Sequence, residues 1–164
     1  MNEIIKAKPT TYRGIEFRSK SEARLAVALD LARVPYWEYE PTIQETDPGE
    51  WKPDFWVRLP VLDWWVDVLV EYKPTSPSRP YVDWWQAQAI KAVGGDLLDE
   101  SGDYSHSSMC VILCGSWFPN FTGLQIEHSA THPDSPVILR YLVAEKLYES
   151  LSFAAKAGSY RFDL

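Results

Sequence analysis

The sequence has no uncharged apolar run near the roughly 18 residues that a membrane-spanning helix requires. Residues 1–8 also lack the apolar stretch of a secretory signal peptide. Internal repeats and low-complexity tracts are missing as well. We therefore expect a protein with no membrane segment and a cytoplasmic location.

Cysteine is scarce, since Cys110 and Cys114 are the only two in the chain. They stand an even number of residues apart in an apolar segment that is typical of a strand, which places both on one face as buried thiols. This pattern excludes a disulfide framework and favours a reducing compartment.

An excess of basic residues is also missing, because the net charge is −7. An acidic total argues against a general polyanion binder. Most of the acidic excess falls after residue 95, and several acids before it are candidate metal ligands whose charge a bound cation would offset. The net charge therefore counts against DNA binding without ruling it out.

The chain does contain enough apolar material for a packed core. Hydrophobic residues make up 46% of the sequence and aromatic residues 14%. This composition excludes an intrinsically disordered chain. A length of 164 residues fits a single domain that spans residues 1–164.

A capped helix is predicted near the start of the chain. Ser19 and Glu22 form a capping box, in which Ser19 is the N-cap and Glu22 the third helical residue. Apolar residues then recur at helical spacing, at Leu25, Ala26, Leu29 and Ala32. The helix should end at Val34, because a proline disfavours a helical residue before it.

Further elements follow from hydrophobic patterns. Segments rich in aromatic or apolar residues predict strands at residues 36–43, 54–59, 64–72 and 109–115. Helices are expected from Asp83 to Gly94 and from Val137 to Ala157, the second with an apolar stripe. Residues 116–135 give no clear pattern. The order helix, three strands, helix, strand, helix predicts an α/β fold with a mixed sheet flanked by helices.

Two carboxylates and a lysine form a candidate catalytic site. Glu71 and Lys73 are two residues apart on a predicted strand, so both side chains point to one face. Asp54 begins the preceding strand and lies beside Glu71 if the two strands form a hairpin. Two neighbouring carboxylates repel each other and favour a divalent cation between them. Oxygen ligands of this kind suit Mg²⁺, or Mn²⁺ in its place.

Next to a bound metal ion, Lys73 has several candidate catalytic roles. It could orient or help deprotonate an attacking water, or stabilise negative charge on a phosphate. A metal ion would polarise the phosphoryl oxygen and lower the pKa of its bound water. The set of residues fits hydrolysis of a phosphodiester bond.

These residues resemble the signature of a known superfamily. Pro53-Asp54 followed by Glu71-Tyr72-Lys73 is similar to the PD-(D/E)xK motif of restriction-endonuclease-like nucleases. Residues 12–24, the segment Tyr36–Pro41 and the phenylalanine after Asp54 resemble small standalone members found in bacteria and their phages. The likeness spans about residues 12–95 and extends weakly to 115.

The resemblance implies an αβββαβ core over about residues 12–115. The helix predicted from the apolar stripe forms a C-terminal helical extension at about 136–158, outside the resemblance. The resemblance implies Asp54 and Glu71 as direct metal ligands, the Tyr72 backbone carbonyl as a further ligand, and Glu22 joining through water. It makes Lys73 the catalytic lysine, Mg²⁺ the cofactor and DNA the substrate, in the cytoplasm of a bacterial cell or a phage-infected host.

Some relatives also carry a glutamine and a tyrosine on the helix after the lysine. Gln86 and Gln88 are present here, but Ile90 and Ala92 stand four residues on, where the tyrosine would be. This role is therefore not transferred to the chain.

Simpler interpretations compete with the proposed site. Glu22 could serve only as the capping glutamate, and Asp54 could be a turn residue at a strand start. Glu71 and Lys73 could form a surface pair worth a few tenths of a kcal/mol, although unpaired charge is costly at the end of so apolar a strand. Glu40 could approach the metal, but an exposed strand position is the default.

Other residues have weaker signals. His128 and His132 have the spacing of a metal-binding pair, but the neighbouring Pro133 favours a solvated loop over a zinc site. Arg18 and Lys20 lead into the N-terminus of the first helix, where anions are favoured, and are predicted to bind nucleic acid. Two tryptophan pairs could stack on bases or pack in a core or interface, namely Trp64-Trp65 and Trp84-Trp85.

Two functions from different classes therefore remain. The first is a magnesium-dependent DNA endonuclease that uses Glu22, Asp54, Glu71 and Lys73. The second is a catalytically silent module of the same fold that binds nucleic acid or a protein partner. The apolar stripe of the C-terminal helix could serve as a homodimer or partner surface in either case.

Overall fold

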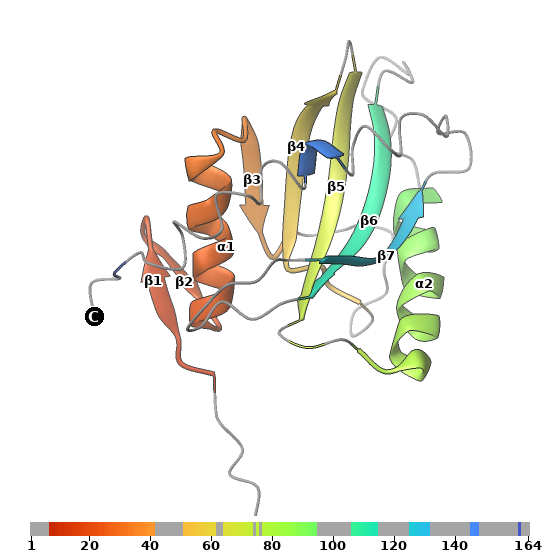
Figure 1. The fold of residues 1–164 in the computed structure, drawn as a ribbon, viewed down its shortest axis with the longest axis horizontal. Helices are drawn as coiled ribbons and strands as arrows, with labels where there is room; N and C mark the ends of the chain where they lie inside the picture. Colours follow the sequence, from red (N-terminus) through yellow and green to blue (C-terminus); the bar gives the residue numbers. More distant parts are fainter. Residues whose placement is uncertain are drawn as a thin grey trace, which may run out of the picture.

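The computed structural model describes residues 7–41, 51–61, 64–73, 75, 77–94, 106–114, 125–131, 145–147 and 161. A two-stranded hairpin is followed by a helix and a five-stranded sheet in which a second helix is inserted (Figure 1). The elements are Thr10–Tyr12 (β1), Ile15–Phe17 (β2), Lys20–Leu31 (α1), Tyr36–Tyr39 (β3), Phe55–Val61 (β4), Trp64–Lys73 (β5), Arg79–Gly94 (α2), His106–Cys114 (β6) and Gln125–Thr131 (β7).

The five-stranded sheet has the order β3-β4-β5-β6-β7. Its strands pair in antiparallel fashion except β5 and β6, which are parallel and are joined through α2. A mixed sheet in an α/β fold is the predicted class. The predicted succession of a helix, three strands, a helix and a strand is found in α1, β3, β4, β5, α2 and β6.

The two helices pack against opposite faces of the sheet. Side chains alternate along β5, so that Val66, Val68 and Val70 join a core with α1, while Leu69 joins a second core with α2. Strand β5 is buried along most of its length, as expected for a strand covered on both faces. Glu71 and Lys73 share the strand face of Leu69, at the end of β5.

Helix α1 begins where the sequence predicts. Ser19 is the N-cap, and its side chain accepts a hydrogen bond from the backbone N–H of Glu22, while the Glu22 carboxylate accepts one from the Ser19 backbone. The predicted capping box is therefore confirmed. The helix is buried from Glu22 to Leu29, and its apolar residues belong to the core on one face of the sheet.

Several element boundaries differ from the predictions. Helix α2 starts at Arg79 and not at Asp83, because the Ser78 hydroxyl accepts from the Tyr81 N–H and proline is tolerated in a first helical turn. Strand β4 runs through Pro60, which is exposed one residue from the strand end, where a missing N–H costs little. Strand β6 begins at His106, three residues before the predicted start.

Three strands were not predicted. The lead-in before α1 forms the β1–β2 hairpin, whose turn has positive φ at Arg13 and Gly14. Strand β7 lies in the segment that gives no clear pattern. It contains His128, so the prediction of a loop at that residue was wrong, and His132 lies outside the described residues.

The C-terminal helix predicted for residues 137–157 lies mostly outside the described residues, of which 145–147 are helical. Cys110 and Cys114 are both buried thiols outside any disulfide, as predicted, and burial raises the pKa of the Cys110 thiol. Within the described ranges, no helix has the length and apolar character needed to cross a membrane.

Candidate active site

Asp54 is placed by backbone hydrogen bonds at the start of β4. Its N–H donates to the Val70 carbonyl at 3.0 Å, and its Oδ2 accepts from the Tyr72 N–H at 2.8 Å. The register pairs Phe55 with Val70, so Asp54 lies one step further on, opposite Glu71. The predicted hairpin is therefore present, and it brings the two acids to one end of the sheet.

Glu71 is buried and each of its carboxylate oxygens accepts a hydrogen bond. Oε2 accepts from Trp51 Nε1 at 2.7 Å, and Oε1 accepts from the Tyr81 hydroxyl at 3.0 Å. Lys73 Nζ lies 2.9 Å from the same Oε1 and 4.9 Å from the centre of the Tyr81 ring. Lys73 is thus fixed beside Glu71, and the surface-pair interpretation fails because Glu71 is only 5% exposed.

Glu22 reaches the same end of the sheet from the first turn of α1. Its Oε2 accepts from the Ser19 N–H at 3.1 Å and from the Tyr39 hydroxyl at 2.9 Å. Its Oε1 lies 3.3 Å from Arg18 Nη2. Glu22 therefore caps the helix with one oxygen and presents the other to the acidic site.

Arg18 lies among the carboxylates. Its Nη2 is 2.5 Å from Asp54 Oδ1, and its Nε is 3.0 Å from Glu40 Oε1. Arg18 is predicted from the sequence to bind nucleic acid, and in the structure its guanidinium is ion-paired with three acids, namely Glu22, Glu40 and Asp54. Glu40 also pairs with Lys52 at 3.6 Å. The sequence favours an ordinary exposed position for Glu40, but its contact with Arg18 places it at the border of the site.

The electrostatics of the site centre on Asp54. Burial and the charge of Glu71 raise its pKa, the Tyr72 N–H lowers it, Glu22 raises it again and Arg18 lowers it, and the net value is about 7. Arg18 therefore offsets only part of the destabilisation of the charged form. The site has more negative charge than its own cations balance.

Lys73 is held in its protonated form. Burial lowers the pKa of its ammonium group, but the Glu71 carboxylate and the Tyr81 hydroxyl raise it, and the net shift is upward. A lysine that keeps its proton stabilises negative charge and does not accept a proton at neutral pH. Of the tasks open to Lys73 from the sequence, this geometry favours charge stabilisation.

The donor set fits a hard divalent cation. Asp54, Glu71 and Glu22 are 4%, 5% and 8% exposed, and burial together with repulsion from Glu71 and Glu22 raises the pKa of Asp54. Buried carboxylate oxygens with uncompensated charge are the ligands that Mg²⁺ and Mn²⁺ prefer. In the described part of the chain, however, no three His, Cys, Asp or Glu side chains are already gathered as a ligand group.

Three aromatic residues of the site were not predicted. Trp51 precedes Asp54 in a segment without a recognisable pattern. Tyr81 falls in the first turn of α2, before the predicted helix start. Tyr39 belongs to the aromatic-acid strand noted in the sequence, but nothing in that pattern indicates its contact with Glu22. Each donates a hydrogen bond to an acid of the site.

The remaining predicted residues lie around the site or away from it. Lys20 is the first residue of α1, and its side chain is exposed. Trp85 of α2 is fully buried in the core between this helix and the sheet, so it cannot stack on bases. Trp65 and Trp84 are 42% and 43% exposed. Gln88 is buried, and its Oε1 has no hydrogen-bond partner in the described part of the chain.

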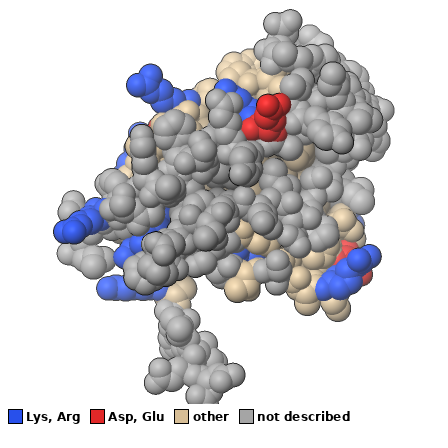
Figure 2. Space-filling view, viewed as in Figure 1, with Lys and Arg blue, Asp and Glu red and all other residues tan. Residues whose placement is uncertain are grey.

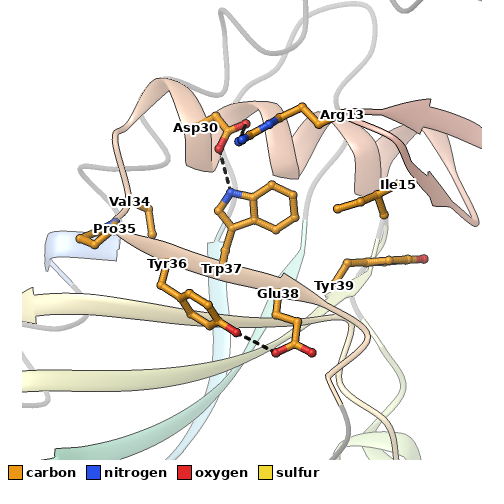
Figure 3. A pocket seen from close by; sticks show the side chains of 9 residues that line it. All are labelled: Arg13, Ile15, Asp30, Val34, Pro35, Tyr36, Trp37, Glu38 and Tyr39. Carbon is orange, nitrogen blue, oxygen red and sulfur yellow. Dashed lines mark hydrogen bonds and ion pairs between the residues drawn. The ribbon is translucent and has the colours of Figure 1, made fainter.

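A cavity of about 480 Å³ borders the site on the other side of Tyr39 (Figure 3). Its polar groups pair with one another: Trp37 and Arg13 donate to Asp30, and Tyr36 donates to Glu38. None of the acids of the candidate site lines it. We therefore place the chemistry at the sheet end and not in this cavity.

The hydrogen bond from Trp51 to Glu71 yields a stability prediction. Trp51→Phe removes a donor to a buried carboxylate and should lower the free energy of unfolding by about 1.5–3 kcal/mol more than loss of ring size alone. Trp85→Phe is the matched control, because Trp85 is buried in the same cluster and its Nε1 has no hydrogen-bond partner among the described residues. Urea unfolding measures both. Equal losses in the two variants would show that the hydrogen bond does not stabilise the site.

Searches against models of protein families, against curated proteins and against solved structures found no match for this chain.

Proposed function

We propose that this chain is a metal-dependent nuclease of the PD-(D/E)xK type that hydrolyses phosphodiester bonds in DNA. The observation that carries the proposal is the convergence of Glu22, Asp54, Glu71 and Lys73, from α1, the start of β4 and the end of β5, with the pKa of Asp54 raised to about 7. The order of α1, β3, β4, β5, α2 and β6 supports the restriction-endonuclease-like core that the resemblance implies.

The acids would hold the cation. Asp54 and Glu71 are the proposed direct ligands, with the Tyr72 backbone carbonyl beside them and Glu22 acting through water. Mg²⁺ is the proposed ion, and Mn²⁺ can replace it. When bound, such an ion polarises the phosphoryl oxygen and lowers the pKa of a bound water.

The chain's own groups do the remaining work. Lys73, protonated and 2.9 Å from Glu71, would stabilise the negative charge that develops on the phosphate as water attacks phosphorus. Trp51 and Tyr81 hold Glu71 in place. Ser19 and Tyr39 hold Glu22 in place. Fixed donors of this kind keep the acids oriented before the substrate arrives.

Exposed basic side chains on the side of the molecule that holds α1 support a nucleic acid substrate despite the acidic total. Figure 2 shows Lys and Arg side chains mainly on the side of the molecule formed by β1, β2 and α1. The exposed basic residues on or beside these elements are Lys8, Arg13, Arg18, Lys20 and Arg33. Lys20 stands at the N-terminus of α1, where the helix dipole favours a phosphate.

Cation binding tests the proposal independently of any substrate. Calorimetric titration with Mn²⁺ should show binding to the wild-type protein. Asp54→Asn removes one ligand charge and should weaken binding by about tenfold or more, in the range found when metal-site partners are lost. A wild-type protein that binds neither Mn²⁺ nor Mg²⁺ would contradict the metal-dependent mechanism.

A further inference from the structure

Arg18 is the only basic side chain in the described part of the chain that contacts both Asp54 and Glu22. We propose that Arg18 is a built-in counter-ion, which the divalent cation displaces and which then binds the substrate phosphate. This inference rests on the proposed function, because it assigns a role to Arg18 in the same site.

The oxygens that Arg18 contacts are the ones a cation would need. Asp54 uses Oδ2 for the Tyr72 N–H, and Glu22 uses Oε2 for the Ser19 N–H and the Tyr39 hydroxyl. The other oxygen of each acid, Asp54 Oδ1 and Glu22 Oε1, is the one in contact with Arg18 Nη2. A cation and Arg18 therefore compete for the same two atoms.

Displacement of Arg18 should cost little. Its side chain is 61% exposed, so solvent screens its ion pairs and can receive the guanidinium as it leaves. A divalent cation has twice the charge, and it would bind Asp54 Oδ1 directly and Glu22 Oε1 through a bound water, so it should win this competition at millimolar concentration. The buried acids can stay in place, because their second oxygens keep their backbone donors.

The released guanidinium should remain near the reacting phosphate. Arg18 Nε lies 3.0 Å from Glu40 and 3.3 Å from the Tyr39 hydroxyl, and its backbone N–H donates to the same hydroxyl at 3.1 Å. These contacts involve neither Asp54 nor Glu22, so they hold Arg18 at the rim when Nη2 is set free. The planar fork of a guanidinium suits two oxygens of a phosphate.

The test compares Arg18→Gln with Arg13→Gln by calorimetric titration with Mn²⁺. Arg13 is the matched control, because it is 63% exposed and ion-paired with Asp30 away from the acids. Removing a partly exposed competitor should tighten Mn²⁺ binding by about three- to tenfold in Arg18→Gln. Arg13→Gln should bind Mn²⁺ as the wild type does.

A second measurement tests the release of Arg18 toward the phosphate. Affinity for a short DNA duplex is measured in a Lys73→Ala background, with Mn²⁺ and with EDTA. Arg18→Gln should weaken DNA binding in Mn²⁺, where the guanidinium is free, and should leave it unchanged or stronger in EDTA, where Arg18 is held by the acids. A purely structural role for Arg18 would weaken DNA binding in both conditions.

Arg18→Lys keeps the positive charge but reaches fewer of the oxygens, so its Mn²⁺ affinity should be intermediate, and it preserves the test if Arg18→Gln does not fold. Mn²⁺ affinities of both variants equal to or weaker than that of the wild type would overturn the inference while the proposed function stands. A wild type that binds no Mn²⁺ would overturn both.

Discussion

Asp54→Asn is expected to make the metal-free protein more stable at mildly alkaline pH, by up to about 4 kcal/mol relative to the wild type. The reason is that burial and the neighbouring Glu71 and Glu22 charges raise the pKa of Asp54 from 3.8 to about 7 in the folded protein. Asparagine resembles the protonated acid and can keep the hydrogen bond from Tyr72, but it carries no charge. Function and stability therefore oppose each other at this residue.

The stability of the wild type should fall as pH rises, because Asp54 loses its proton in the folded protein. Between pH 3.8 and about 7 the folded wild type holds a proton on Asp54 that the unfolded chain has released. The stabilisation is complete below this window, falls as pH rises through it at about 1.4 kcal/mol per pH unit, and is lost above it. Asp54→Asn lacks this loss, so the two proteins should be close in stability at the acidic end and differ most at the alkaline end.

Urea unfolding in EDTA across this pH range measures the effect. Asp67→Asn is the control, because Asp67 is as buried as Asp54 but is paired with Arg58 at 2.8 Å and is remote from the acidic cluster. It should destabilise the protein by leaving Arg58 without its partner. An Asp54→Asn variant that is less stable than the wild type at alkaline pH would contradict the electrostatic account of the site.

Lys73→Ala is expected to lower the rate of DNA cleavage by about 10²–10³-fold, the usual effect of removing one donor that stabilises transition-state charge. Lys73 keeps its proton and lies against Glu71, so its loss removes positive charge from the proposed reaction site. Single-turnover cleavage measures the rate, and circular dichroism checks that the fold is retained.

Lys91→Ala controls for the loss of a lysine elsewhere. Lys91 is exposed in the last turn of α2, at the opposite end of that helix from Tyr81. Its removal should leave the cleavage rate near that of the wild type. Full activity in Lys73→Ala would remove Lys73 from the catalytic set.

Elements with strong local signals could be predicted from the sequence. The capping box fixed the start of α1, and the apolar run of β5 indicated a strand covered on both faces. Asp54 and Glu71 could be paired on the condition that their two strands form a hairpin, and the register in the structure places them opposite each other. Local pattern and spacing are enough for these features.

Other features depend on contacts between distant segments. Trp51 and Tyr81 approach Glu71 only because β4, β5 and α2 meet there, and no spacing rule brings residues 51, 71 and 81 together. Strand β7 (Gln125–Thr131) mixes polar and apolar residues without the β-branched run of a buried strand, and its pairing with β6 decides its structure. The ion pairs of Arg18 could not be predicted, because a helix N-terminus attracts anions in general, while this one has buried carboxylates of its own within reach.

The measurement that tests the central claim most directly is cleavage of a panel of labelled nucleic acids, namely linear duplex, single strand, fork, four-way junction and RNA. Wild type and Lys73→Ala are assayed in parallel with Mg²⁺, with Mn²⁺ and with EDTA. The account predicts cleavage of at least one DNA substrate by the wild type with either metal, none in EDTA, and greatly reduced cleavage by Lys73→Ala. No cleavage of any substrate with either metal would contradict it and would favour a catalytically silent binding module.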